Sequence, residues 1–351
     1  MNNFPTKMKA AILEKINNPL IIDDVELPNQ LYWGQVLVKV FYTTICGSQL
    51  GEIDGVKGID SYLPHLLGHE GSGEVIRTGP GVKTVSTGDH VVLHWMTGNG
   101  IQSELPEYRW KGKKLNAGWV TTFNEYAVVS EDKITVIPKT FDLKIAPLFG
   151  CAVTTAFGLI NNKAKLKIGQ SIIIFGAGGV GLNVVQGSSM VSAYPIIAVD
   201  IFDNKLRLAK KLGATHCINT TKVNLKNELT RLLDKKGADV VIDNTGIPEI
   251  IETAYDYTSK NGKTILVGVP PSGQNASLYT LPLHFGKTIT GTKGGESLPH
   301  IDIPNYIRLI EANKYSLDNL IADHYTLHQI NDAIDLMRGG HIAGRCLIDF
   351  T

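Results

Sequence analysis

The feature that most constrains the fold is a glycine-rich segment at residues 171–182, which reads SIIIFGAGGVGL. An apolar stretch that suits a buried strand comes directly before Gly176, Gly178 and Gly181, whose spacing satisfies the pattern GxGxxG. The residues that follow can form a helix, and IIAVD at 196–200 then closes a β-α-β unit of about 30 residues. This order predicts a doubly wound fold built on a parallel sheet.

The chemistry of a bound dinucleotide explains the glycine spacing. Gly176 permits a tight turn, Gly178 lets the backbone approach a pyrophosphate, and Gly181 allows the helix to pack closely on the strand. The N-terminus of the helix offers free N–H groups and a partial positive charge to the phosphate, so Gly179 and Val180 belong to the same candidate site. The alternative is a glycine-rich turn without a ligand.

Asp200 indicates which dinucleotide the chain prefers. It lies 19 residues after Gly181, at the end of the next expected strand. A carboxylate there accepts hydrogen bonds from the adenosine ribose hydroxyls and repels a 2′-phosphate. The next two residues are apolar, so no arginine sits beside Asp200 to hold that phosphate, and Lys205 is the nearby candidate cofactor contact. We therefore expect NAD rather than NADP.

The rest of the chain divides into a β-rich first part and an α/β middle part. A length of 351 residues suggests two domains that each bury a core. Short segments rich in β-formers predict a small barrel or two packed antiparallel sheets in the first part; they are 35–42, 71–79, 89–94 and 123–129.

In the middle part, apolar runs without alternation imply strands that are covered on both faces, with helices between them. The expected strands are 171–175, 196–200, 238–245 and 262–269, and the expected helices are 204–212 and 225–233. The tail combines helical stretches with a last strand; these are 303–313, 327–340 and 345–350.

Composition excludes several classes of protein. Lys and Arg number 34 against 33 Asp and Glu, so charge gives no reason to expect a nucleic acid or an anionic membrane as partner. The longest apolar runs are too short to span a bilayer. The N-terminus MNNFPTKMKA has no apolar secretory segment, and the 4 cysteines contain no CxxC. We therefore expect a cytoplasmic protein without a disulfide framework.

Four residues offer a set of metal ligands. Cys46 lies in TTICGSQ, His69 and Glu70 lie in LLGHEGSGEV, and Cys151 lies in APLFGCAVTTAFG. Two thiols, an imidazole and a carboxylate suit tetrahedral zinc, and a Cys₂His set leaves a fourth position for water or substrate. A lone cysteine is more often a buried apolar residue, which is how we interpret Cys217 and Cys346. His65 faces either the active-site cleft or a surface or core position.

Five segments extend this pattern along the whole chain: GHEGSGEV, GDHVV, the GC-x-V-x-T-x-x-G segment around Cys151, the GxGGVG loop, and LxxINDAIDLMRGG. Together they closely resemble the zinc-dependent alcohol dehydrogenases of the medium-chain dehydrogenase/reductase superfamily. The resemblance implies a GroES-like barrel catalytic domain over residues 1–152 and a Rossmann NAD-binding domain over 153–293. Residues 294–351 would then return to the catalytic domain.

The resemblance also implies roles for individual residues. Cys46, His69 and Cys151 would ligate one catalytic zinc, and Glu70 would lie behind it or act as a transient ligand during water exchange. Ser48 would hydrogen-bond the alcohol oxygen. The enzyme would transfer a hydride between an alcohol, which is primary, secondary or of the polyol or sugar type, and NAD. It would thereby interconvert the alcohol and an aldehyde or ketone.

Two further expectations rest on the same resemblance. Arg345, just before the last strand, resembles the arginine that contacts the cofactor phosphate. Residues 288–292 are expected to form the last strand of the parallel sheet, at one margin. An unpaired edge invites association, and the resemblance implies that it pairs with a twofold mate. We therefore expect a homodimer or a homotetramer.

The chain also departs from the family pattern. Gln49 stands where the family often has Asp, and Gly51 stands where some members have a His that relays a proton. The stretch 94–123 has no cysteine, whereas many members hold a structural zinc there with four, so we expect no second zinc. Its aromatic and basic residues either cover the barrel or shape a substrate or subunit surface; they are Trp95, Tyr108, Trp110, Trp119 and KGKK at 111–114.

Two other functions remain open from the sequence. A zinc-free, NADPH-dependent quinone or enone reductase would share the fold, but it would need none of the three ligands. A non-catalytic NAD-binding protein would need neither the ligands nor Ser48. The joint presence of these residues favours the dehydrogenase, with a small alcohol or carbonyl compound as its partner.

Overall fold

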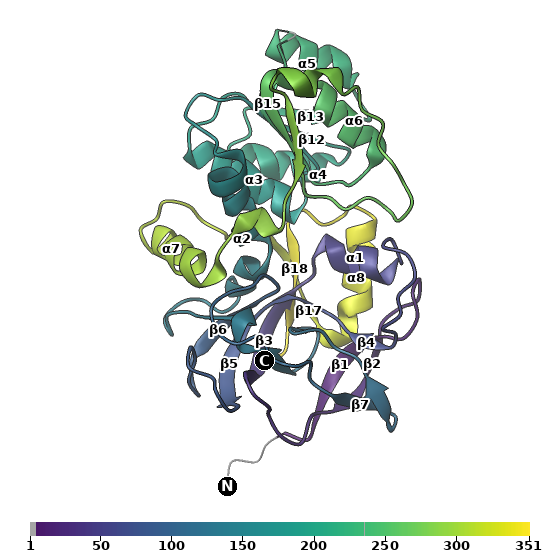
Figure 1. The fold of residues 1–351 in the computed structure, drawn as a ribbon, viewed down its shortest axis with the longest axis vertical. Helices are drawn as coiled ribbons and strands as arrows, with labels where there is room; N and C mark the ends of the chain where they lie inside the picture. The colour runs from purple at the N-terminus through teal and green to yellow at the C-terminus, as the bar shows by residue number, and fades with distance from the viewer. Residues whose placement is uncertain (1–4, 235) are drawn as a thin grey trace.

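An antiparallel β region forms the lower half of the molecule in Figure 1, and a parallel α/β region forms the upper half. The computed structural model describes residues 5–234 and 236–351. Residues 1–4, which belong to the expected first domain and to the N-terminal segment considered above, lie outside it. None of the helices in the described part of the chain is long and apolar enough to cross a membrane.

The parallel sheet has the strand order of a doubly wound fold. Its order is β13-β12-β11-β14-β15-β16, so the chain starts in the middle, moves to one edge, and then returns to build the other half. The strands are β11 (Ile172–Phe175), β12 (Ile196–Asp200), β13 (His216–Asn219), β14 (Ala238–Asp243), β15 (Thr258–Leu266) and β16 (Thr288–Gly291). Continuous apolar sequence in β11 is buried throughout, as expected for a strand with both faces covered.

The helices between these strands are α3 (Gly179–Met190), α4 (Asp203–Lys211), α5 (Leu225–Leu233) and α6 (Pro248–Asp256). Local sequence explains their first residues. The Asn224 side chain caps α5 by accepting a hydrogen bond from the Asn227 N–H at 3.0 Å. Pro248 occupies the first turn of α6, where its missing N–H is not needed. The α/β middle part predicted from the sequence is therefore confirmed.

The antiparallel region consists of two sheets. The first contains β1 (Lys7–Leu13), β2 (Ile21–Glu26), β4 (His65–Leu66), β7 (Tyr108–Trp110) and β8 (Lys113–Leu115). The second contains β3 (Gln35–Thr44), β5 (Glu70–Thr78), β6 (His90–His94), β9 (Tyr126–Ser130), β10 (Ile134–Val136), β17 (Ile321–Thr326) and β18 (Arg345–Asp349). Strand β3 pairs with β5, β9 and β18, so the C-terminal strand joins a sheet built mainly from the first third of the chain.

Four helices lie around this region or at its junction with the parallel sheet: α1 (Gly47–Ile53), α2 (Ala152–Gly158), α7 (Pro299–Glu311) and α8 (Ile330–Arg338). Helix α2 packs against α3, and α7 contacts α2 and β10. The two halves are therefore connected by packed helices as well as by the chain itself.

Some boundaries differ from the sequence prediction. The strand expected at 123–129 begins at Tyr126, because Asn124 forms an isolated bridge with Ala10 in the other sheet. The strand expected at 262–269 runs from Thr258 to Leu266, with a register shift where β15 meets β14. The expectation of a buried Cys217 is wrong, because its side chain is exposed in β13, a strand at the edge of the parallel sheet.

The aromatic residues of 94–123 serve two purposes. Tyr108 and Trp110 lie in β7 and belong to the apolar core beneath the first sheet. Trp110 donates its indole N–H to Asp23 Oδ2 at 2.8 Å, and the Tyr108 hydroxyl accepts the Val128 N–H at 2.7 Å. Trp95 and Trp119 instead line cavities, as described below.

Buried His94 couples the stability of the fold to pH. Its Nδ1 donates to the Met96 carbonyl at 2.9 Å, and its Nε2 accepts from the Thr135 hydroxyl at 2.9 Å. Burial lowers the pKa of His94 from 6.5 to about 4. The unfolded chain therefore binds more protons between these two pH values, so stability is present above about pH 6.5 and is lost as the pH falls toward 4.

We predict that His94→Gln flattens this dependence. The wild type should lose about 2 kcal/mol of unfolding free energy through this group between pH 7 and pH 5, and the variant should lack that part of the loss. Denaturant unfolding at the two pH values measures it, with the exposed His328→Gln as control. If His94→Gln and wild type lost the same unfolding free energy between pH 7 and pH 5, this role of His94 would be contradicted.

Candidate active site

The glycine loop between β11 and α3 has the geometry that each glycine position requires. Gly176 adopts a φ of +84°, which suits the tight turn. A Cβ added at Gly181 would lie 1.9 Å from the Gly176 carbonyl oxygen, so only glycine permits this approach of helix to strand. A Cβ at Gly178 would meet nothing within 4 Å. The loop is therefore closely packed behind Gly181 and open at Gly178, where a phosphate has room.

Asp200 stands at the end of β12, beside this loop. Its Oδ2 accepts the Ala177 N–H at 2.7 Å, and its Oδ1 accepts the Ile201 N–H at 2.7 Å. The carboxylate thus braces the turn in addition to its expected role toward the ribose. Lys205 lies over the ring of Phe202, with its Nζ 4.6 Å from the ring centroid. It does not line the large cavity that is described next.

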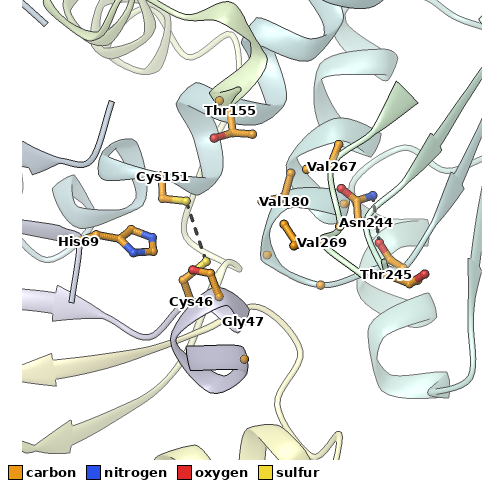
Figure 2. Close-up of a pocket in the computed structure, with 18 of the residues that line it drawn as sticks. Cys46, Gly47, His69, Cys151, Thr155, Val180, Asn244, Thr245, Val267 and Val269 are labelled. Atoms are coloured by element: carbon orange, nitrogen blue, oxygen red, sulfur yellow. Dashed lines mark hydrogen bonds between the residues drawn. The ribbon is translucent and has the colours of Figure 1, made fainter. Parts of the chain in front are cut away.

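A cavity of about 780 Å³ lies between the antiparallel region and the parallel sheet. Figure 2 shows Cys46, His69 and Cys151 on one side of it and a wall with Val180 and Asn244 on the other. All five candidate residues of the glycine loop line the cavity, and so does Ser48; the five are Gly176, Gly178, Gly179, Val180 and Gly181. The fold therefore brings the two groups of residues predicted from separate motifs to one space.

The candidate metal ligands meet at the ends of three secondary-structure elements. Cys46 precedes α1, His69 precedes β5, and Cys151 precedes α2. One potential ligand atom from each of these residues and from Glu70 lies within 4.8 Å of the others. The sulfurs of Cys46 and Cys151 are 3.9 Å apart. Two thiolates of tetrahedral zinc lie about 3.8 Å apart, given Zn–S bonds of about 2.3 Å, so the spacing fits.

Unpaired buried atoms give a second indication that the set fits a metal. His69 Nε2 is buried and has no hydrogen-bond partner among the described residues. The carboxylate oxygens of Glu70 likewise have no hydrogen-bond partner there, although Oε1 forms an ion pair with Arg345 Nε at 3.3 Å. Buried polar atoms without partners are costly and rare. A cation coordinated by His69 Nε2 would remove this cost for the ring nitrogen and would face two thiols.

Electrostatics at the cluster favour one thiolate. A hydrogen bond from the Cys151 thiol holds the pKa of Cys46 well below its usual range, and the charge of Arg345 acts in the same direction. Burial raises the pKa of Glu70 to about 7, against the effect of Arg345. The same hydrogen bond, together with burial, raises the pKa of the Cys151 thiol, so the site favours a thiolate at Cys46 alone.

Arg345 is buried between the metal ligands and the glycine loop. Its Nη2 donates to Cys46 Sγ at 3.2 Å, and its Nε lies 3.3 Å from Glu70 Oε1. A Cβ added at Gly179 would lie 2.6 Å from Arg345 Cζ, so the guanidinium packs directly against the loop. The sequence suggested a phosphate contact for Arg345 and missed its contacts with Cys46 and Glu70. No sequence signal links these positions.

Gln49 bridges two of the ligand residues. Its Oε1 accepts the Cys46 N–H at 3.2 Å, and its Nε2 contacts His69 Nδ1. The side chain is buried in α1. The contact holds the His69 ring at Nδ1 without the charge that a carboxylate would add. Metal ligation through Nε2 requires the ring proton on Nδ1, and the amide oxygen of Gln49 accepts that proton when the amide is turned over.

Other cavity residues were not predicted from the sequence. Asn244 and Thr245 follow β14, and Val267 and Val269 follow β15, so all four lie beyond the carboxyl ends of parallel strands. Ligands bind at these ends in open α/β sheets, which is a signal that would have found them. Trp95, the residue after β6, also lines the cavity.

Comparison with known proteins now places the chain. The family model described as "Alcohol dehydrogenase GroES-like domain" matches residues 33–139, and the one described as "Zinc-binding dehydrogenase" matches 179–312. Alcohol dehydrogenase 6 of Peromyscus maniculatus is 31% identical over 369 residues, which cover 97% of each chain. The chain belongs to the zinc-dependent alcohol dehydrogenase family.

Other relatives within this family agree. S-(hydroxymethyl)glutathione dehydrogenase of Paracoccus denitrificans is 29% identical over 95% of this chain and 97% of its own. The crystal structure of benzyl alcohol dehydrogenase from Acinetobacter calcoaceticus superposes with a TM-score of 0.88, at 30% identity, over 98% of this chain and 99% of that one. The present chain is therefore an oxidoreductase that acts on CH–OH groups, and it has the two-domain fold predicted from the sequence.

We predict that Cys46→Ala and Cys151→Ala each lose zinc. Elemental analysis after dialysis should find about one zinc per wild-type chain and far less in either variant, because a three-ligand site cannot spare a ligand. NAD binding should persist, since the glycine loop is untouched. The exposed Cys217→Ala is the matched control and should keep its metal. Full zinc content in Cys46→Ala would refute the ligand set.

Proposed function

We propose that the protein is an NAD-dependent alcohol dehydrogenase with a single catalytic zinc, held by Cys46, His69 and Cys151. The observation that carries this proposal is that the buried Cys-His-Cys set and the glycine loop line one cavity. When bound, zinc supplies a Lewis acid for the alcohol oxygen and NAD supplies the hydride acceptor. The absence of cysteine from residues 94–123 supports a single zinc.

The chain's own residues position the reactants and move the proton. Ser48 lines the cavity two residues after Cys46, and we assign its hydroxyl the proton of the alcohol. Gly51 also lines the cavity but has no side chain to take that proton further. The proton therefore leaves through the cofactor ribose, water or another group. Val180, Val267 and Val269 give the opposite wall an apolar surface that limits access of water.

Behind the reactants, Arg345 and Glu70 connect the two halves of the site. The guanidinium stabilises the Cys46 thiolate and packs beneath Gly179, so it connects the metal ligands with the phosphate-binding loop. Its charge also favours the nearby cofactor phosphate. Glu70 is buried behind the ligands and forms an ion pair with Arg345. We assign its carboxylate the role of a transient zinc ligand during water exchange.

A zinc-free enone reductase is the second candidate within this fold. Such an enzyme would use neither the two buried thiols nor His69 Nε2, which has no hydrogen-bond partner among the described residues. The ligand set therefore favours the dehydrogenase. Turnover of a panel of alcohols with NAD, lost on chelation and restored by zinc, tests the proposed function directly. Reduction of enones by the chelated enzyme with NADPH would instead support the second candidate.

Cofactor choice depends on Asp200. We predict that Asp200→Gly improves the use of NADP relative to NAD by about tenfold or more, because the change removes the charge that repels a 2′-phosphate. Asp200→Asn separates the two roles, since it retains an acceptor and removes the charge. Steady-state kinetics with both cofactors give the ratio, with Asp203→Asn, at a side chain that is 43% exposed, as control. A wild type that already prefers NADP would disprove the argument.

Assembly follows from the free edge of the parallel sheet. Strand β16 pairs with β15 on one side, and no other strand of the described residues pairs with it. Tyr279, Leu281 and Phe285 nearby are exposed large apolar residues. We assign this margin to a twofold interface that continues the sheet, which gives a homodimer or a larger assembly.

The free thiols of all four cysteines fit the cytoplasm as the location of the protein.

Ile289→Pro tests this interface. Proline removes an N–H donor from the ladder and should therefore weaken the pairing of β16 across the twofold axis. Light scattering at micromolar concentration should find a dimer or larger assembly for wild type and a shift toward monomer for the variant. Circular dichroism checks that the variant is folded. A monomeric wild type would refute the assignment.

A further inference from the structure

A second cavity of about 430 Å³ lies beside the first, within the antiparallel region. His69 and Trp95 line both cavities, so the candidate metal site stands at their boundary. Several polar or charged side chains line the second cavity; they include Glu52, Asp60, His65, Asn116 and Lys133. A ligand pocket normally holds a few placed polar groups among apolar ones, and these groups fix the orientation of the ligand.

Lys133 contributes a buried ammonium group with spare hydrogen-bonding capacity. Its side chain is 6% exposed. Its Nζ donates to Asp132 Oδ2 at 2.9 Å and to Thr97 Oγ1 at 3.3 Å. An ammonium has three N–H donors, and no acceptor for the third is found among residues 5–234 and 236–351. Asp132 Oδ1 is also buried without a partner.

The same cavity offers acceptors. His65 Nε2 donates to Asp60 Oδ2 at 2.8 Å, and Nδ1 of the same ring lies 3.0 Å from the Leu66 carbonyl oxygen. Glu52 Oε1 is 3.9 Å from His65 Nε2, beyond hydrogen-bond distance, and its side chain is partly exposed. The Glu52 carboxylate is therefore held only by this long ion pair and can accept a hydrogen bond from a ligand, while the third N–H of Lys133 can donate one.

We propose that this second cavity selects an alcohol that carries a further hydroxyl group, such as a diol or polyol, and that Lys133 donates to that hydroxyl. The inference rests on the proposed dehydrogenase function and deepens it. The reacting hydroxyl would lie beside His69, and the remainder of the substrate would extend along Trp95 into the second cavity. Trp119, which lines the same cavity, offers it a flat apolar surface.

A hydroxyl suits this environment better than an anionic or apolar group. A hydroxyl is a donor and an acceptor at once. Its oxygen can accept from the Lys133 ammonium, and its O–H can donate to the Glu52 carboxylate. An anion would find Lys133 neutralised by Asp132 at 2.9 Å and would meet the carboxylates of Glu52 and Asp60. An apolar tail would bury Lys133 while leaving its third N–H unpaired, which costs free energy.

The first experiment uses wild-type holoenzyme and pairs of substrates that differ in one group. Each diol from propane-1,3-diol to octane-1,8-diol is compared with the primary alcohol of the same length. At one chain length or more, kcat/KM should favour the diol by at least about tenfold, because a site built around a hydroxyl discriminates against the analogue that lacks it. A ratio near one at every length would overturn the inference, even if all of the alcohols react.

The second experiment removes the donor. In Lys133→Met, the preference for the diol should fall at least about tenfold through KM, with kcat less affected. The exposed Lys139→Met is the matched control and should keep the wild-type ratio. Because Lys133→Met leaves the Asp132 charge buried and unpaired, Asp132→Asn/Lys133→Met is made alongside it. A wild-type preference retained in the folded double variant would overturn the role of Lys133.

A binding measurement gives a readout that does not need turnover. Quenching of tryptophan fluorescence by hexane-1,6-diol should exceed that by hexan-1-ol, because Trp95 and Trp119 line the cavity, and the difference should vanish in the double variant. Tighter binding of 6-hydroxyhexanoate than of the diol would overturn the choice of a neutral hydroxyl. Selective diol binding without any NAD-dependent turnover would refute the proposed function and leave the cavity assignment standing.

Discussion

The buried contact of Arg345 with Cys46 and Glu70 is the interaction on which the site depends. Burying a guanidinium costs several kcal/mol unless opposite charges and hydrogen-bond acceptors surround it. Arg345 finds them 3.2 Å away at Cys46 Sγ and 3.3 Å away at Glu70. Because Arg345 begins β18, these partners meet only when the C-terminal strand docks on β3. Docking of the tail therefore places the guanidinium beside the candidate metal ligands.

The order of the parallel strands explains why the candidate metal ligands face the glycine loop. In the parallel sheet the chain turns back between β11 and β14, and ligands bind at such a switch point beyond the carboxyl ends of the strands. Gly176 follows β11 and Asn244 follows β14, and both line the large cavity. The antiparallel region closes the other side with Cys46 and Cys151. An alcohol at the metal and a dinucleotide at the loop would therefore share one space.

The segment 94–123 is held in place by the packing of its aromatic side chains. Tyr108 and Trp110 secure it by burial in the core. Trp95 and Trp119 are left to line the cavities. The segment thus contributes to the shape of the pocket beside His69 while its own packing is apolar.

The sequence by itself determined the order of strands and helices, the glycine turn and the identity of the candidate ligands. The elements and the turn are local features, because periodicity, apolar runs and GxGxxG are recorded within about 30 neighbouring residues. The candidate ligands lie far apart in the sequence, and they were found through the resemblance of several separate segments to one family. Only the tertiary structure decided that Arg345 contacts Cys46, that Gln49 bridges to His69, and that Lys133 is buried beside a cavity. Such contacts join separate segments of the chain and depend on how the sheets pack. Neither residue type nor spacing carries that information.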